Sequence, residues 1–246
     1  MGRVDVPTFV DFILEKTSLE TISYVGHSEG TTQFILGASL MPEYYSQKIN
    51  LSILLAPVGS TANIPIPYLR DAAKYIKEIE YALVHALNYP NWFAPMPRGE
   101  EALTLFCGVL PSICKKAASL MHHEGVDNGE RFSTFISNEP SGASYRTFVY
   151  YAQMINSGRA ALYDYGPIKN NKIYGQREAP LIPIENYKVP TVLMSGSLDK
   201  LADPEDVKWL SAALGDNVVF EKEYENDHFT FAIGKDMSFF SQDAVE

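Results

Sequence analysis

The most constraining feature of this sequence is the pentapeptide GHSEG at residues 26–30, because of what stands on either side of it. Residues 20–26 (ETISYVG) form a short stretch with β-branched and aromatic side chains, which predicts a strand. Residues 29–40 repeat apolar and small side chains on one helical face, which predicts a helix. A Gly-x-Ser-x-Gly pattern between a strand and a helix is typical of a serine held in a sharp turn at the edge of a parallel sheet.

The residues of this turn suit a nucleophile. Gly26 and Gly30 let the strand and the helix approach closely, and His27 and Glu29 flank the serine. The turn projects the Ser28 hydroxyl at a helix N-terminus, where the helix dipole favours a developing oxyanion and the backbone N–H of Glu29 can donate to it. We therefore predict Ser28 as a nucleophile. The alternative is a serine that only caps the helix.

The rest of the chain predicts an α/β protein with a parallel sheet and a long insertion. Further strands and helices are predicted from apolar runs and capping residues: strands at 49–56, 190–196 and 217–224, and helices after Asp5, over 204–215 and over 230–240. Residues 57–189 break this alternation, hold most of the prolines and many aromatics, and begin with a helix around 70–87. We expect 1–56 and 190–246 to form an α/β-hydrolase core and 57–189 a mostly helical cap.

A serine hydroxyl is a poor nucleophile unless a base takes its proton, and five histidines compete for that role. His228 directly follows the strand predicted at 217–224, which places it at the edge of the sheet. Three of the other histidines follow no predicted sheet strand: His85, His122 and His123. His27 adjoins the serine and is expected to point away from it. We predict His228 as general base and acid; a solvated loop histidine is the alternative.

The base must in turn be oriented by an acid, for which the sequence offers three carboxylates. Asp199 lies in the loop after the strand at 190–196, from which it could reach a histidine at the end of the next strand. Asp203 is the nearest rival, but its place before Pro204 suits a helix cap. Asp227 is next to the histidine, so its side chain is directed elsewhere. We predict Asp199, which gives the order Ser, Asp, His found in α/β-hydrolases.

Composition excludes several other classes of protein. With 20 Lys+Arg against 30 Asp+Glu and a formal charge of −10, the chain is not a strongly basic nucleic-acid binder. No apolar run reaches about 18 residues, so no transmembrane segment is predicted. The His, Cys and Asp residues do not have the spacing of metal ligands, so no metal site is expected.

At this point the sequence resembles the acid lipase family, the gastric and lysosomal lipases with an α/β-hydrolase core and a helical cap. The resemblance runs through nearly the whole chain and rests on these segments: VGHSEGTT, NEPSGAS at 138–144, YYAQ ending at Gln153, YDYG at 163–166, Asn171 before Tyr174-Gly175, SGSLDKLADPEDV at 195–207, and NDHFTF with His228 and Phe231. One departure is Glu29, where the family usually has Gln.

The resemblance implies a serine ester hydrolase of lipid catabolism that acts on triacylglycerols or sterol esters through an acyl-enzyme, with Ser28, Asp199 and His228 as the triad. It implies no cofactor, a lipid ester substrate, transient contact of the cap with a lipid interface, and a lysosomal or secreted location. It also implies a short cap disulfide between Cys107 and Cys114, to which two reduced, buried cysteines are the alternative. The chain as written is expected to carry no signal peptide and to lack the N-terminal third of the family's chain. The alternatives are a short-acyl esterase or thioesterase, or a catalytically incompetent remnant.

Overall fold

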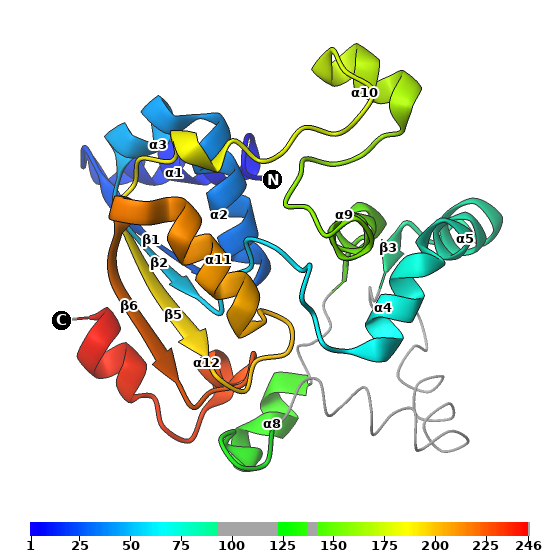
Figure 1. Ribbon diagram of the computed structural model, residues 1–246. Helices are drawn as coiled ribbons and strands as arrows, with labels where there is room; N and C mark the ends of the chain where they lie inside the picture. Colours follow the sequence, from blue (N-terminus) through cyan, green and yellow to red (C-terminus); the bar gives the residue numbers. More distant parts are fainter. Residues whose placement is uncertain (93–122, 137–141, 246) are drawn as a thin grey trace.

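The computed structural model describes residues 1–92, 123–136 and 142–245 (Figure 1). Within them a four-stranded parallel sheet runs in the order β1 (Ile22–His27), β2 (Ile49–Leu55), β5 (Thr191–Gly196) and β6 (Val218–Tyr224). All three neighbouring pairs are parallel, so all four strands end at the same edge of the sheet. The predicted α/β fold class is confirmed, and each predicted strand is present to within two residues at either end.

Helices cover both faces of this sheet. Since successive side chains of a strand point to opposite sides, each strand contributes side chains to both cores. Leu54 and Leu193 face a core built with α1 (Asp5–Thr17), α2 (Glu29–Leu40) and α11 (Pro204–Leu214). Ile53 and Met194 face the opposite core, which the C-terminal segment supplies through Phe231 and Phe239. The near-continuous apolar runs in β2 and β5 are therefore explained by burial on both faces.

The described residues between β2 and β5 lie beside the sheet, and most of their regular elements are helices (Figure 1). These elements, in chain order, are α4 (Pro67–Lys74), α5 (Ile76–Glu80), the π-helix η1 (Tyr81–Ala86), β3 (Asn91–Trp92), α8 (Gly129–Ile136), β4 (Ala143–Ser144), α9 (Tyr145–Ser157), α10 (Pro167–Tyr174) and the 3-10 helix η2 (Ile184–Asn186). A third core joins α4 and α5 to α9 through Ala73, Ile76 and Val149. In the described part of the chain, no helix is both long enough and apolar enough to cross a membrane.

Several helix predictions differ from the structure in their detail. The single helix predicted over 230–240 is wrong: α12 (Thr230–Ile233) ends at Gly234, and a separate π-helix, η4 (Phe239–Ala244), follows. The Gly234 backbone turns to an extended conformation, and Asp236 accepts the Ser238 N–H to start the next turn. The helix predicted around 70–87 is divided into α4, α5 and η1. Outside residues 57–189, two short elements were not predicted, α3 (Pro42–Lys48) and the 3-10 helix η3 (Gly215–Asn217).

Close packing of α2 against the N-terminus gives a prediction about stability. A Cβ at Gly37 would lie 2.2 Å from Tyr45 Oη and 2.4 Å from the Gly2 carbonyl oxygen, where the Tyr45 hydroxyl donates a hydrogen bond of 2.6 Å. Gly37→Ala is therefore expected to lower the free energy of unfolding by about 2 kcal/mol through overpacking. Gly129→Ala is the matched control, because nothing lies within 4 Å of that position. Urea denaturation of both variants checks this, and equal stabilities would contradict it.

Candidate active site

Ser28 occupies the turn between β1 and α2 and has a backbone conformation that non-glycine residues rarely adopt, with φ 53° and ψ −115°. Its N–H donates to Leu55 O at 3.1 Å, and its carbonyl accepts from the Thr31 N–H at 2.9 Å and the Thr31 hydroxyl at 2.6 Å. A Cβ at Gly26 would lie 2.7 Å from the Tyr24 ring and 3.1 Å from the Gly30 carbonyl carbon. The turn is therefore held by backbone bonds and requires the first glycine of the pattern.

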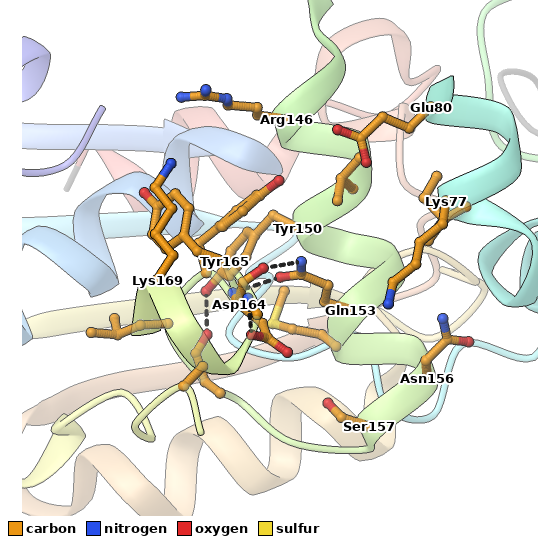
Figure 2. A pocket seen from close by; sticks show the side chains of 18 of the residues that line it. Lys77, Glu80, Arg146, Tyr150, Gln153, Asn156, Ser157, Asp164, Tyr165 and Lys169 are labelled. Carbon is orange, nitrogen blue, oxygen red and sulfur yellow. Dashed lines mark hydrogen bonds between the residues drawn. The ribbon is translucent and has the colours of Figure 1, made fainter. Parts of the chain in front are cut away.

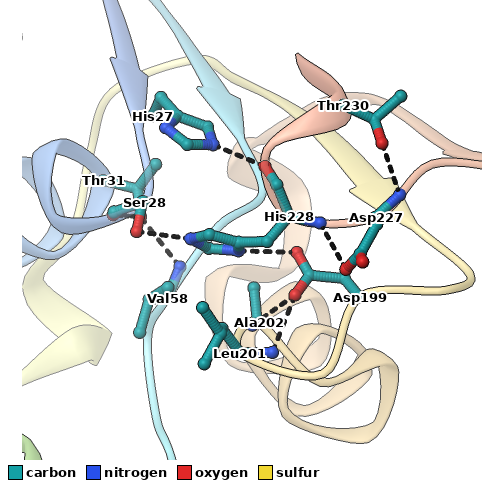
Figure 3. A network of polar contacts seen from close by, with 10 residues as sticks. All are labelled: His27, Ser28, Thr31, Val58, Asp199, Leu201, Ala202, Asp227, His228 and Thr230. Atoms are coloured by element: carbon teal, nitrogen blue, oxygen red, sulfur yellow. Dashed lines mark hydrogen bonds and ion pairs between the residues drawn. The ribbon is translucent and has the colours of Figure 1, made fainter. Parts of the chain in front are cut away.

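The structure brings together the three side chains predicted as the triad (Figure 3). His228 Nε2 lies 2.6 Å from Ser28 Oγ, and His228 Nδ1 lies 2.8 Å from Asp199 Oδ2. A carboxylate only accepts hydrogen bonds, so the proton of the neutral imidazole sits on Nδ1 and leaves Nε2 free to accept the serine proton. The aspartate and the histidine are each 2% exposed, so this pair is screened from water.

Loops after three strands place these groups at the edge of the sheet where the strands end. Ser28 follows β1, Asp199 follows β5 and His228 follows β6. Backbone bonds join the last two loops, from Ser197 N to Tyr224 O at 2.8 Å and from Leu198 N to the Asn226 carbonyl at 3.1 Å. The triad residues therefore occur in the sequence in the same order as the strands that they follow, β1, β5 and β6.

Asp199 is held at both carboxylate oxygens, whereas its two rivals are engaged elsewhere. Its Oδ1 accepts the N–H groups of Leu201 and Ala202, both at 2.8 Å, while Oδ2 faces the imidazole. Asp203 caps α11 by accepting the Glu205 N–H at 2.9 Å, and burial raises its pKa. Asp227 accepts the backbone N–H of His228 at 2.7 Å rather than a ring nitrogen.

His27 contacts the main chain of the base, His228, which the sequence does not predict. Its Nε2 lies 2.8 Å from the His228 carbonyl oxygen, and the two imidazole rings are 5.0 Å apart. Because a carbonyl only accepts, Nε2 is the protonated nitrogen of the neutral ring. Burial, with a further contribution from the neighbouring His228, lowers the pKa of His27 to about 4. Its support of the base depends on a contact across 201 sequence positions, for which the sequence carries no signal.

Glu29, the predicted oxyanion residue, begins α2, where the first N–H groups of a helix have no acceptor within the helix. Its backbone N–H follows the serine directly, as an oxyanion donor must. Its carboxylate oxygen Oε1 lies 3.4 Å from both Gln33 Nε2 and Thr147 Oγ1. The side chain thus links α2 to α9.

Two of the remaining histidines lie outside this cluster. His85 lies in η1, and His123 precedes α8. His122, Cys107 and Cys114, with the expected disulfide, lie outside the described residues. Among the residues that the structure does describe, no group of three or more His, Cys, Asp or Glu side chains could hold a metal ion.

A groove of about 1100 Å³ lies beside α9 (Figure 2). Tyr150 and Gln153 of α9 line it, together with residues of α5, η1 and the 159–179 segment, and no triad residue does. The same helix contacts α2 through Thr147 and through Tyr151, whose hydroxyl lies 3.1 Å from Thr32 Oγ1. The helix therefore contributes side chains both to the groove and to the contact with α2.

Fold and site together define an α/β-hydrolase. No protein-family model matches the chain. Among solved structures, the chain is similar to the Paleococcus ferrophilus monoacylglycerol lipase, with a TM-score of 0.50 and 16% identity over 92% of this chain and 67% of that one. That likeness supports the fold alone.

Its curated relatives are lipases of the gastric and acid type, which confirms the resemblance found in the motifs. The chain is 31% identical to mouse lipase member K over 96% of its length, and 32% identical to rat gastric triacylglycerol lipase over 91%. It is also 27% identical, over its full length, to a tear acid lipase-like protein of the hamster Mesocricetus auratus. The chain spans 59%, 56% and 62% of the length of these three relatives, respectively.

Proposed function

We propose that this chain carries the catalytic machinery of a lipase-type carboxylic ester hydrolase. The single observation that carries the proposal is the continuous hydrogen-bonded row from Asp199 through His228 to the strained Ser28. A buried row of this kind can lower the barrier to attack by a hydroxyl that is otherwise unreactive at neutral pH.

In the proposed reaction, Ser28 Oγ attacks the ester carbonyl carbon while His228 Nε2 takes its proton. The tetrahedral oxyanion accepts the backbone N–H of Glu29 at the start of α2, where the helix dipole adds to its stabilisation. The imidazolium then gives its proton to the leaving alcohol, and an acyl-enzyme remains on Ser28. Water, deprotonated by the same imidazole, releases the carboxylic acid and restores the serine. Asp199 orients the ring and stabilises its charge throughout.

The substrate class follows from the relatives and from the aromatic content of the insertion. The lipases named among the relatives, one of them a triacylglycerol lipase, support a lipid ester such as a triacylglycerol. A sterol ester is the other candidate that the motif resemblance implies. We propose that residues 57–189 act as a cap over the serine and make transient contact with the lipid interface, since α9 already contacts α2 beside the nucleophile. The same relatives support a secreted or lysosomal location.

Fluorophosphonate labelling tests the proposal. The native protein is expected to be labelled at Ser28 and to hydrolyse p-nitrophenyl esters, while Ser28→Ala removes both activities because the nucleophile is gone. Ser23→Ala is the matched control, since its hydroxyl contacts Asn50 at an exposed position. Labelling that survives in Ser28→Ala would refute the proposal. A rate that falls steadily from acetate to long acyl chains would favour a short-acyl esterase over a lipase.

A further inference from the structure

Residues 123–128, which precede α8, run alongside the segment that carries the histidine of the triad. Asn128 N donates to Ile233 O at 2.7 Å, and Lys235 N donates to Val126 O at 2.8 Å. Between these two bonds, Asp127 and Gly234 form an antiparallel bridge. The insertion is therefore attached by backbone bonds to the chain a few residues after the base.

At the centre of this attachment is the carboxylate of Asp127, a residue only 1% exposed. Its Oδ1 accepts the Thr230 hydroxyl at 2.6 Å, and its Oδ2 accepts the His123 N–H at 2.6 Å. Burying a carboxylate costs free energy unless hydrogen bonds satisfy its oxygens. The docked segment therefore requires these two contacts.

Thr230 connects Asp127 to the backbone beside the base, His228. Its hydroxyl has one proton, which goes to Asp127, so its acceptor side faces the Asp227 N–H at 3.0 Å (Figure 3). Asp227 in turn accepts the N–H of His228 at 2.7 Å, and His27 holds the carbonyl of that histidine. The main chain of the base is thus fixed on both sides, and one side depends on Asp127.

We propose that Asp127 and Thr230 are positioning residues that make the placement of the His228 imidazole depend on docking of the 123–128 segment. When the segment is docked, the chain Asp127–Thr230–Asp227 holds the ring within reach of Ser28. When it leaves, the Thr230 hydroxyl loses its acceptor and the base loses one of its two main-chain supports. This inference rests on the proposed function, and it makes part of the cap a determinant of turnover rather than of substrate access alone.

Three variants of the full chain test it. Thr230→Val keeps the shape but removes the hydroxyl, and we expect kcat for a p-nitrophenyl ester to fall about 10- to 100-fold with little change in KM, because a misplaced base slows the chemical step. Thr230→Ser restores the hydroxyl and is expected to recover kcat to within about threefold of the native value. Thr191→Val is the matched control: it also removes a buried hydroxyl, which donates to Val189 O at 2.9 Å, but at the start of β5, away from the triad. We expect it to lose stability and keep kcat.

Coupling between the two positioning residues gives a second measurement. Asp127→Asn keeps the size of the side chain but turns one acceptor into a donor, so it too should lower kcat at constant KM. The double variant Asp127→Asn/Thr230→Val is expected to be no slower than Thr230→Val, because both changes break the same chain of bonds. If Thr230→Val does not fold, Asp127→Asn alone decides. A native kcat in that variant, or in a folded Thr230→Val, overturns the inference.

A proton NMR signal separates failure of this inference from failure of the proposed function. The proton shared by His228 Nδ1 and Asp199 should give a low-field resonance in the native protein, Thr230→Ser and Thr191→Val, and a shifted or broadened one in Thr230→Val. A native protein that does not react with the fluorophosphonate would refute the proposed function. The low-field resonance would still report the position of the imidazole ring in that case. A labelled native protein with an unchanged resonance in Thr230→Val would overturn the positioning role alone.

Discussion

Replacing Asp199 by Asn is expected to lower kcat about 10⁴-fold while the protein stays folded. The two backbone donors, Leu201 N and Ala202 N, hold the amide oxygen in the place of Oδ1, so the new NH₂ group faces His228 Nδ1. That nitrogen must then accept, the ring proton moves to Nε2, and the base can no longer take the proton of Ser28. The rate of fluorophosphonate labelling and kcat for a p-nitrophenyl ester measure the effect.

Asp203→Asn is the control for this change. It makes the same chemical substitution in the same loop, but Asp203 only caps α11, and Asn caps a helix about as well as Asp. Native turnover is therefore expected. A kcat for Asp199→Asn within tenfold of the native value would mean that Asp199 does not set the tautomer of the base.

Stability is expected to fall as the pH is lowered from 6.5 to 4 because of His27. Its pKa is about 4 in the folded protein, while an imidazole in the unfolded chain titrates near its ordinary value of 6.5. As the pH falls, the unfolded chain therefore binds the proton first, and the free energy of unfolding drops by about 3 kcal/mol in total. This contribution is fully present above pH 6.5 and is lost once the pH reaches 4.

Urea unfolding of the native protein and His27→Gln at pH 7, 5.5 and 4 isolates that contribution. Glutamine can still donate to the carbonyl of His228 but does not titrate, so the stability of the variant relative to the native protein should rise as the pH falls. All other titrating groups are common to both proteins and cancel in the difference. A difference that is the same at the three pH values would rule out His27 as the source.

The sequence predicts the part of this molecule that local pattern determines. Ser28, Asp199 and His228 each directly follow a β-strand or lie a few residues beyond one, and parallel strands end at a common edge, so their meeting could be expected before any coordinates. The capping of α11 by Asp203 was predictable for the same reason, since Asp before Pro is a local signal.

Contacts between distant segments could not be predicted in this way. The approach of His27 to the backbone of His228, and of Asp127 to Thr230, joins residues that are 201 and 103 positions apart. The break at Gly234 was missed because apolar spacing over 230–240 fits one helix, while the bridge with Asp127 requires an extended backbone there. Long-range pairing therefore overrides local periodicity in this segment.

The order of the strands has a mechanical consequence for the proposed chemistry. The nucleophile follows β1 and the base follows β6, with β2 and β5 between them in the four-stranded sheet. The 2.6 Å distance between Ser28 Oγ and His228 Nε2 therefore depends on the packing and twist of the two intervening strands as well as on the contacts of the loops. A cavity made at Leu54 or Leu193, both fully buried near the centre of the sheet, would slow acylation without touching a reacting group. The reaction rate would then report on the packing density of the protein core.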